Sequence, residues 1–439
     1  MIINNLLRVN MDKIILIGIG TAALGVAISY SDIYLFHCWF LFVGLIKLIQ
    51  LKNSENLSKY QMQFSKYTIF LFFLFVWYFI SILWSPDTIL GLKYLFYILC
   101  GIIITNTIIS FSNNLEKLNN IYKILCYIFI LELIIAFLES FGIFRWPISP
   151  FSNWHTFFGK DEVDSFANYN LFGYSKFKPP TGFHWNTNNL AITMVMILPF
   201  FLCNKNFSIK LIGAFCITLI TIFAASRAVF LGLILIYLIY LIVIKKHVTT
   251  LAFIWTFILC LFWGMNSLRD SDNPRINEVA NSIEALELYL KGDIDIGGSL
   301  EWRRELVKNG LEELKKSNGL GVGAGGATAL QEEKGGVAGR FTSMHNFWIE
   351  ILVEGGIVIG LFGLFWYINI IYNLFLVTKN KKSPELKFFS QSLILSMIGF
   401  IPSAISASST IYFFPMWIMF GLAISVIIIN DKSLINMIY

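Results

Sequence analysis

Long apolar runs separated by polar connections make up most of this sequence. A helix that crosses a bilayer needs roughly 20 mostly apolar residues. The runs predict about twelve such helices, with apolar cores at 14–30, 33–49, 67–84, 94–109, 124–143, 190–203, 211–225, 229–244, 251–265, 357–377, 388–407 and 411–429. The pattern therefore predicts an all-α polytopic membrane protein.

The composition agrees with a lipid environment. Of 439 residues, 56% are hydrophobic and 14% are charged, whereas soluble domains carry about 25% charged residues. The mean hydropathy is +0.69. These values exclude a disordered chain, a disulfide scaffold and a cytosolic enzyme. The six cysteines fall in or beside apolar runs and form no C-x-x-C pair, so neither zinc binding nor a disulfide framework is predicted.

Lysine placement predicts the orientation. Lysines cluster in the connections near residues 47–66, 245–246 and 379–387, and an excess of lysine marks the cytoplasmic side. Both termini are then cytoplasmic in a plasma (inner) membrane. Three regions follow: 1–265, with the first nine helices and an outer loop at 144–189; a large outer loop at 266–346; and 347–439, with a re-entry helix and the last three spanning helices.

Arginine shows the opposite bias, because every arginine except Arg8 falls on the predicted outer side. Guanidinium groups bind phosphate oxygens in a bidentate manner, so this face is expected to bind an anionic ligand, most simply a diphosphate. Arg227 lies between two apolar runs with almost no loop. A charge at that depth is costly unless it is paired or functional; contact with lipid headgroups is the alternative.

The large outer loop contains a predicted amphipathic helix at 300–316. At 100° per residue its apolar face comprises Leu300, Val307, Leu311 and Leu314. Arg303 falls on this face and Arg304 on its flank. An arginine on an apolar face points toward a partner carboxylate or a ligand phosphate.

Two further motifs in this loop are weaker signals. The glycine-rich stretch 319–326 lacks the G-K-[S/T] ending of a P-loop, so an NTPase is excluded. Its glycines either bring the backbone close to a ligand or the membrane, or form a mobile loop. Asp293 and Asp295 form a D-x-D pattern that is more typical of capping than of metal binding.

His345 lies where the large loop re-enters the membrane, shortly before Glu354 and a Gly-Gly pair. A neutral imidazole with a pKa of about 6 to 7 is a suitable proton acceptor; an interfacial capping histidine is the alternative. The first outer loop is rich in aromatic residues and closes with a polar segment, 180–189.

Taken in order, these segments resemble the O-antigen ligase and Wzy-type polysaccharide polymerase superfamily. The similar segments are 181–191, 226–228, 303–311, 319–323, 345–346 and 354–356. Val307 stands where the superfamily often has Trp. The resemblance implies a GT-C-like glycosyltransferase with its active site on the outer face.

The resemblance also implies substrates and residue roles. The donor would be a glycan on undecaprenyl diphosphate, and the acceptor a glycan or lipid-linked glycan; the other partners would be membrane lipid and a chain-length regulator, with no nucleic acid, metal or cofactor. His345 would be the catalytic base. Diphosphate contacts would come from Arg227, Arg303 and Arg304, and substrate contacts from Arg340, Asn346, Glu354, His184 and Asn188.

The sequence leaves several functions open. A polymerase of capsule, exopolysaccharide, O-antigen or teichuronic acid repeats is favoured over an O-antigen ligase that transfers glycan to lipid A-core. A transporter or a flippase of lipid-linked oligosaccharides is a further alternative. Against it, the apolar runs contain few charged residues, of which Glu132 is the main one.

Overall fold

The computed structural model describes residues 2–51, 66–160, 179–224, 226–244, 299–337, 342–379, 383–407, 409 and 411–435. Within these ranges the helices are joined by turns and irregular segments, and two short strands form a small hairpin. Its main helices are α1 (Ile2–Leu24), α2 (Leu35–Leu51), α3 (Ile69–Ser81), α4 (Thr88–Phe111), α5 (Leu115–Ser140), α7 (Thr187–Leu202), α8 (Phe207–Ala224), α9 (Arg227–Ile239), α12 (Ser299–Lys316), α13 (Gly326–Glu333), α14 (Phe347–Thr378), α15 (Pro384–Ser403) and α16 (Phe414–Ile435).

Shorter elements connect these helices. They are the 3₁₀ turns η1 (Gly25–Ala27), η3 (Ile82–Trp84) and η4 (His155–Phe158), the π-helical turn η5 (Tyr240–Ile244), and the strands β1 (Ser29–Tyr30) and β2 (Ile33–Tyr34). The two strands pair antiparallel. The predicted core 14–30 therefore ends early, because the helix stops at Leu24 and the hairpin follows.

Each predicted apolar core in the described residues overlaps a helix, while the core 251–265 lies outside them. Within the described residues, six helices are long and apolar enough to cross a membrane: Thr88–Phe111, Leu115–Ser140, Phe207–Ala224, Phe347–Thr378, Pro384–Ser403 and Phe414–Ser433. Three more apolar helices in the described part of the chain are shorter: Ile69–Trp84, Thr187–Leu202 and Arg227–Ile242. An integral membrane protein is confirmed, and the number of twelve spans stays a prediction.

Polar side chains start several of these helices. The Asp87 carboxylate accepts hydrogen bonds from the N–H groups of Ile89 and Leu90, and Asn114 caps α5 in the same way. Ser383 caps α15, where Pro384 occupies the first turn. Such caps satisfy backbone donors that a helix leaves open at its first turn. The short polar connections thus fix where each apolar helix begins.

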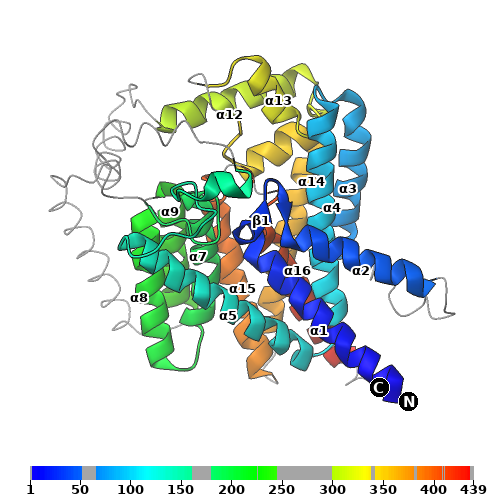
Figure 1. Cartoon of the computed structure of the whole chain (residues 1–439), viewed down its shortest axis with the longest axis vertical. Coiled ribbons are helices and arrows are strands. Elements are labelled where there is room, and N and C mark those ends of the chain that lie inside the picture. Colours follow the sequence, from blue (N-terminus) through cyan, green and yellow to red (C-terminus); the bar gives the residue numbers. More distant parts are fainter. Residues whose placement is uncertain are drawn as a thin grey trace.

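In the core, α15 packs against α7 and α9, and α16 packs against α4. Glycines permit close contact: a Cβ added at Gly232 of α9 would lie 2.3 Å from Ser403 Oγ of α15. Figure 1 shows α12 and α13 together at one end of the helical bundle, while the start of α1 and the end of α16 lie at the opposite end. We call the first of these the α12 end.

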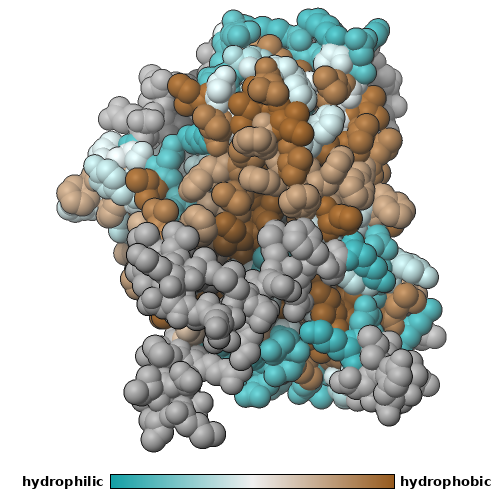
Figure 2. Space-filling view, turned by 90° about the vertical axis from the view of Figure 1, so that its right-hand side faces the viewer, coloured by the Kyte–Doolittle hydropathy of each residue, from teal (hydrophilic) through white to brown (hydrophobic). Residues whose placement is uncertain are grey.

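The surface has the distribution of polarity expected for a bilayer. Figure 2 shows a broad apolar band on one face, with hydrophilic residues above it. Side chains of α3 and α14 stay exposed although they are large and apolar, among them Phe79 at 60% and Phe365 at 69% exposure. An apolar band of this size would be unfavourable in water and is favourable against lipid chains.

Candidate functional site

His345 lies at the junction between the large loop and α14. Its backbone has φ of 48°, in the left-handed region that residues other than glycine rarely adopt. The next residue, Asn346, caps α14 through its side chain, which accepts from Ile349 N at 3.3 Å. The His345 side chain makes a hydrogen bond with the backbone of Ser406. The ring is therefore held against the connection between α15 and α16.

Arg303 approaches His345 from α12. The buried face of this helix contains Leu306, Gly310 and Leu314, and a Cβ at Gly310 would lie 2.6 Å from Met344 Cε. Arg303 is half-buried on the same side, whereas Arg304 is exposed. The predicted face was only partly right, because Leu311 is 40% exposed. The Leu300 side chain lies outside the described residues.

The electrostatic surroundings keep His345 neutral. Burial in the first place, and the Arg303 charge in the second, lower the pKa of His345 to about 4. The value of about 6 to 7 expected from the sequence was too high, because a sequence does not reveal burial or a nearby cation. At neutral pH the ring has a lone pair with which it can accept a proton, although as a weaker base than free imidazole.

Arg227 is the first residue of α9 and follows the N-cap Ser226. The start of α9 lies beside the end of α15, since Gly232 packs on Ser403. The end of α15 also contacts the start of α14, where Phe347 N donates to Ala404 O at 3.2 Å. The N-termini of α9 and α14 thus border the same segment of chain. Arg340 lies outside the described residues, as do Asp293 and Asp295.

The glycine-rich stretch packs against a break in α14. Gly356 has φ of 79° and ψ of 177° within that helix, and the freed backbone groups pair with the stretch: Val322 N donates to Val353 O at 2.9 Å, and Ile357 N donates to Gly319 O at 2.9 Å. A Cβ at Gly321 would lie 2.4 Å from Glu354 O. The glycines therefore bring two backbones of this chain together.

Glu354 stabilises the same junction. It is fully buried and accepts a hydrogen bond from Tyr78 Oη at 3.2 Å. Its carboxylate also bonds the backbone of Gly325 and Ala327, at the start of α13, where a helix favours negative charge. Glu350, one turn earlier, is also buried and accepts from Tyr94 Oη at 3.4 Å. A direct substrate contact by Glu354 stays a proposal, and its present partners are protein groups.

Two buried glutamates on α5 hold the polar segment 180–189. Glu139 Oε2 accepts from Thr181 N at 2.7 Å and Gly182 N at 2.8 Å, and its Oε1 accepts from Trp146 N at 3.0 Å. Arg145 Nη1 lies 3.7 Å from Glu139 Oε2. This arginine, counted among the outer arginines in the sequence, thus has a carboxylate partner.

Glu132 lies two turns before Glu139 and contacts His184. Glu132 Oε1 accepts from Phe183 N at 3.2 Å and lies 3.1 Å from His184 Nε2. Thr193 Oγ1 of α7 lies 2.9 Å from the same ring nitrogen. Sequence reasoning identified Glu132 only as an isolated charge in an apolar run and did not identify Glu139. Their spacing of seven residues on one helix face was the available signal.

His184 and His345 border one short connection. The His184 ring centroid lies 5.6 Å from that of Phe413, and His345 bonds Ser406, seven residues earlier in the chain. Asn188 is half-buried in the first turn of α7, where its N–H donates to the capping Asn186 side chain at 2.8 Å. His345 and His184 thus border the α15–α16 connection, and the Arg303 charge acts on His345.

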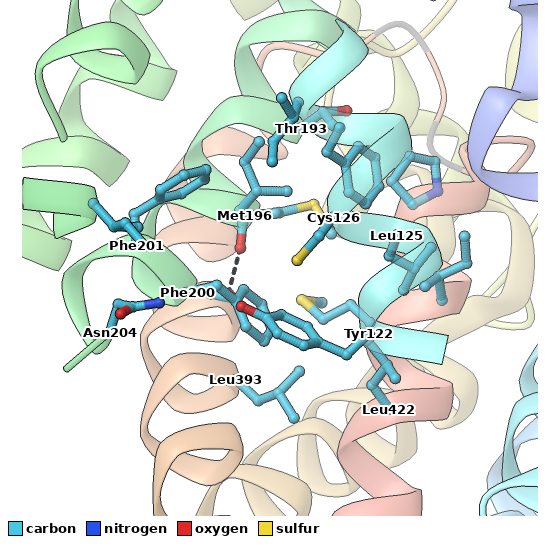
Figure 3. Close-up of a pocket in the computed structure, with 18 residues that line it drawn as sticks. Tyr122, Leu125, Cys126, Thr193, Met196, Phe200, Phe201, Asn204, Leu393 and Leu422 are labelled. Carbon is cyan, nitrogen blue, oxygen red and sulfur yellow. Dashed lines mark hydrogen bonds between the residues drawn. The ribbon is translucent and has the colours of Figure 1, made fainter. Parts of the chain in front are cut away.

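A separate apolar cavity of about 230 Å³ lies among α5, α7, α15 and α16. Figure 3 shows Tyr122 and Cys126 of α5 facing Met196 and Phe200 of α7 across it, with Thr193 at one edge. None of the predicted site residues that the structure describes lines it. Thr193 is the link to the polar groups, because its hydroxyl contacts His184.

In the described part of the chain, no group of three or more His, Cys, Asp or Glu side chains is arranged to hold a metal ion. The acidic side chains near the candidate site are Glu132, Glu139, Glu350 and Glu354, and they bond to protein donors.

Comparison with known proteins identifies the segment that carries much of this arrangement. Residues 212–365 match the family model described as "Wzy_C: O-Antigen ligase". The resemblance to the O-antigen ligase and Wzy-type superfamily is confirmed. The "Teichuronic acid biosynthesis protein TuaE" of Bacillus subtilis (strain 168) is 23% identical over 425 residues, which are 94% of this chain and 83% of that protein. The matched residues 212–365 include Arg227, Arg303 and His345, whereas His184 precedes them.

Proposed function

We propose that this chain is a membrane glycosyltransferase that polymerises the repeat units of a cell-surface polysaccharide. Its donor is a glycan on undecaprenyl diphosphate, and its acceptor is a second lipid-linked glycan. The superfamily match and the similarity to a teichuronic acid biosynthesis protein support a role in cell-surface polysaccharide formation. The same similarity favours polymerisation over transfer to lipid A-core.

One observation carries the proposal: Arg303 lies within electrostatic reach of a neutral, half-buried His345. Glycosyl transfer from a diphosphate needs a proton acceptor for the incoming hydroxyl and positive charge for the leaving group. A neutral imidazole beside a guanidinium meets both needs within one segment. The left-handed backbone at His345 adds support, because such strain is concentrated at functional sites.

The reaction follows from these groups. An acceptor hydroxyl oxygen attacks the anomeric carbon, and its proton passes to His345. The bond between the anomeric carbon and the diphosphate oxygen breaks, and the leaving diphosphate keeps the electron pair. Arg227 and Arg303 stabilise its charge, so no metal ion is required. Attack opposite the leaving group inverts the anomeric centre, and the protonated His345 then releases its proton to water.

The experiment uses the purified protein in liposomes with a fluorescent undecaprenyl-diphosphate oligosaccharide, with and without EDTA. A ladder of products in both conditions supports polymerisation without metal. A single addition, and only when lipid A-core is supplied, indicates the ligase, and movement of donor between leaflets without new glycosidic bonds indicates a flippase.

The matched variants are His345→Ala and His155→Ala. Loss of a general base lowers rates about 10²- to 10⁴-fold, and we expect this only for His345→Ala. His155 lies in η4 with its Nδ1 at 2.6 Å from Ser152 O, so its removal should leave transfer nearly unchanged. Equal rates for wild type and His345→Ala would contradict the assignment.

A further inference from the structure

The His184 ring has an environment that selects one tautomer. Thr193 Oγ1 donates its single proton to Asn189 O at 3.0 Å, because a carbonyl can only accept. Toward His184 Nε2, at 2.9 Å, the hydroxyl is then an acceptor. Glu132 Oε1, which already accepts from Phe183 N, is a second acceptor at 3.1 Å from the same nitrogen. Both neighbours require a proton on Nε2.

A neutral imidazole with a proton on Nε2 has its lone pair on Nδ1. Among the described residues, no hydrogen bond involves His184 Nδ1. The side chain retains 8% exposure. The contacts of the ring with the carboxylate and the hydroxyl thus leave Nδ1 as a hydrogen-bond acceptor that no described residue uses.

The two glutamates of α5 differ in how their carboxylate oxygens are used. Both oxygens of Glu139 are used by backbone N–H groups of the loop. Glu132 Oε1 has two partners, whereas Oε2 is buried without a hydrogen-bond partner in the described part of the chain. A buried acceptor left unsatisfied is destabilising. The feature specific to Glu132 is the contact of its Oε1 with the His184 ring.

We propose that Glu132 and Thr193 are positioning residues that hold His184 as its Nε2–H tautomer, so that Nδ1 accepts a hydrogen bond from a sugar hydroxyl. The glycan part of this inference rests on the proposed function. The location supports it, because His184 packs on Phe413 of the connection that also holds His345. A glycan bound at His345 would extend over this connection toward His184.

The first test reads the tautomer without any activity measurement. Protein labelled with ¹⁵N at histidine is reconstituted in lipid bilayers, and the His184 signals are assigned by their loss in His184→Gln. We expect a protonated Nε2 and an unprotonated Nδ1 in the wild type. Glu132→Leu combined with Thr193→Val should shift the population toward the other tautomer, whereas Glu139→Gln should not. A proton on Nδ1 in the wild type, whether in the other tautomer or in an imidazolium, would overturn the proposal.

The second test is kinetic. Loss of a hydrogen bond that fixes a binding group should raise the KM for the acceptor glycan about tenfold, corresponding to about 1.4 kcal/mol, with a smaller change in kcat. Glu132→Leu should show this split, and Glu132→Gln, which keeps an acceptor oxygen, should restore most of the affinity. Glu139→Gln should lower thermal stability and leave the KM of the folded fraction unchanged.

The two tests separate the possible failures. A wild-type protein that transfers no glycan would refute the proposed function and the glycan contact, while the ¹⁵N spectra would still decide the positioning by Glu132. Transfer with unchanged KM in both Glu132→Leu and His184→Gln would refute the glycan contact and leave the proposed function intact.

Discussion

The Arg303 charge acts on the His345 ring, although the two residues are 42 positions apart in the sequence and belong to different elements. Arg303 lies on the buried side of α12, and His345 precedes α14 in a left-handed conformation. Without a bound anion, the guanidinium opposes protonation of the imidazole. A diphosphate between or beside them would neutralise part of that charge and make His345 a stronger base when the donor is in place.

This relationship predicts the pH dependence of transfer. The pKa of His345 is lowered to about 4, first by burial and then by Arg303. A base must be unprotonated, so kcat/KM, which reports on the free enzyme, should stay high above this value and fall as the pH falls through about 4. In Arg303→Gln one cause of the lowering is removed, and the acidic limb should move to higher pH. Arg304→Gln serves as the control, and the same displacement in both variants would argue against the contact.

The two adjacent arginines should differ in their roles. Arg303 is half-buried on the side of α12 that faces His345, while Arg304 is exposed. Lysine keeps the charge but loses the planar fork that binds phosphate oxygens in pairs. Arg303→Lys should therefore lower kcat/KM for the lipid diphosphate donor at least about tenfold, whereas Arg304→Lys should stay within about twofold of wild type. Donor titrations of the two variants in the same liposomes test this, and a larger loss for Arg304→Lys would reverse the assignment.

Much of this arrangement could be predicted from the sequence, because apolar runs and a 3.6-residue period report directly on spanning and amphipathic helices. Arg303 was placed on the inner face of its helix by that period alone. The roles of Glu132 and Glu139 could not be predicted in this way. Their partners are backbone N–H groups of residues 181–183, which have no sequence signature, and they become neighbours only when the outer loop folds back on α5.

The glycine-rich stretch shows a second limit. From the sequence, an approach to a ligand, an approach to the membrane and a mobile loop were all compatible with it. The partner is the broken segment of α14, and the contact depends on hydrogen bonds between backbones of residues 319–323 and 353–357. Glycine content predicts that some close approach or positive φ is needed, but it does not identify the group that is approached.

The same junction gives a stability prediction with a matched control. Gly356 and Gly335 both have φ of 79°, but a Cβ would lie 2.2 Å from Leu320 O at Gly356 and would meet nothing within 4 Å at Gly335. Gly335→Ala should therefore lower the free energy of unfolding only by the left-handed backbone strain of about 1–2 kcal/mol. Gly356→Ala should lower the free energy of unfolding by a further amount of about 1–3 kcal/mol, because the added Cβ overpacks the contact with Leu320. The Tm of thermal unfolding in detergent should be highest for wild type, lower for Gly335→Ala and lowest for Gly356→Ala. An equal decrease of Tm in the two variants would mean that the contact with Leu320 is not close.

The orientation in the membrane can be tested at two exposed lysines. Lys308 lies on α12 at one end of the bundle, and Lys387 lies in the first turn of α15. Lysine-rich connections such as 379–387 are expected in the cytoplasm, and the arginines at the α12 end are expected to face the outside. In a cysteine-free background, Lys308→Cys should react with an impermeant maleimide in intact cells, whereas Lys387→Cys should react only after lysis. Labelling of Lys387→Cys alone in intact cells would invert the topology and place His345 in the cytoplasm. Glycan polymerisation on the outer face would then have to be abandoned.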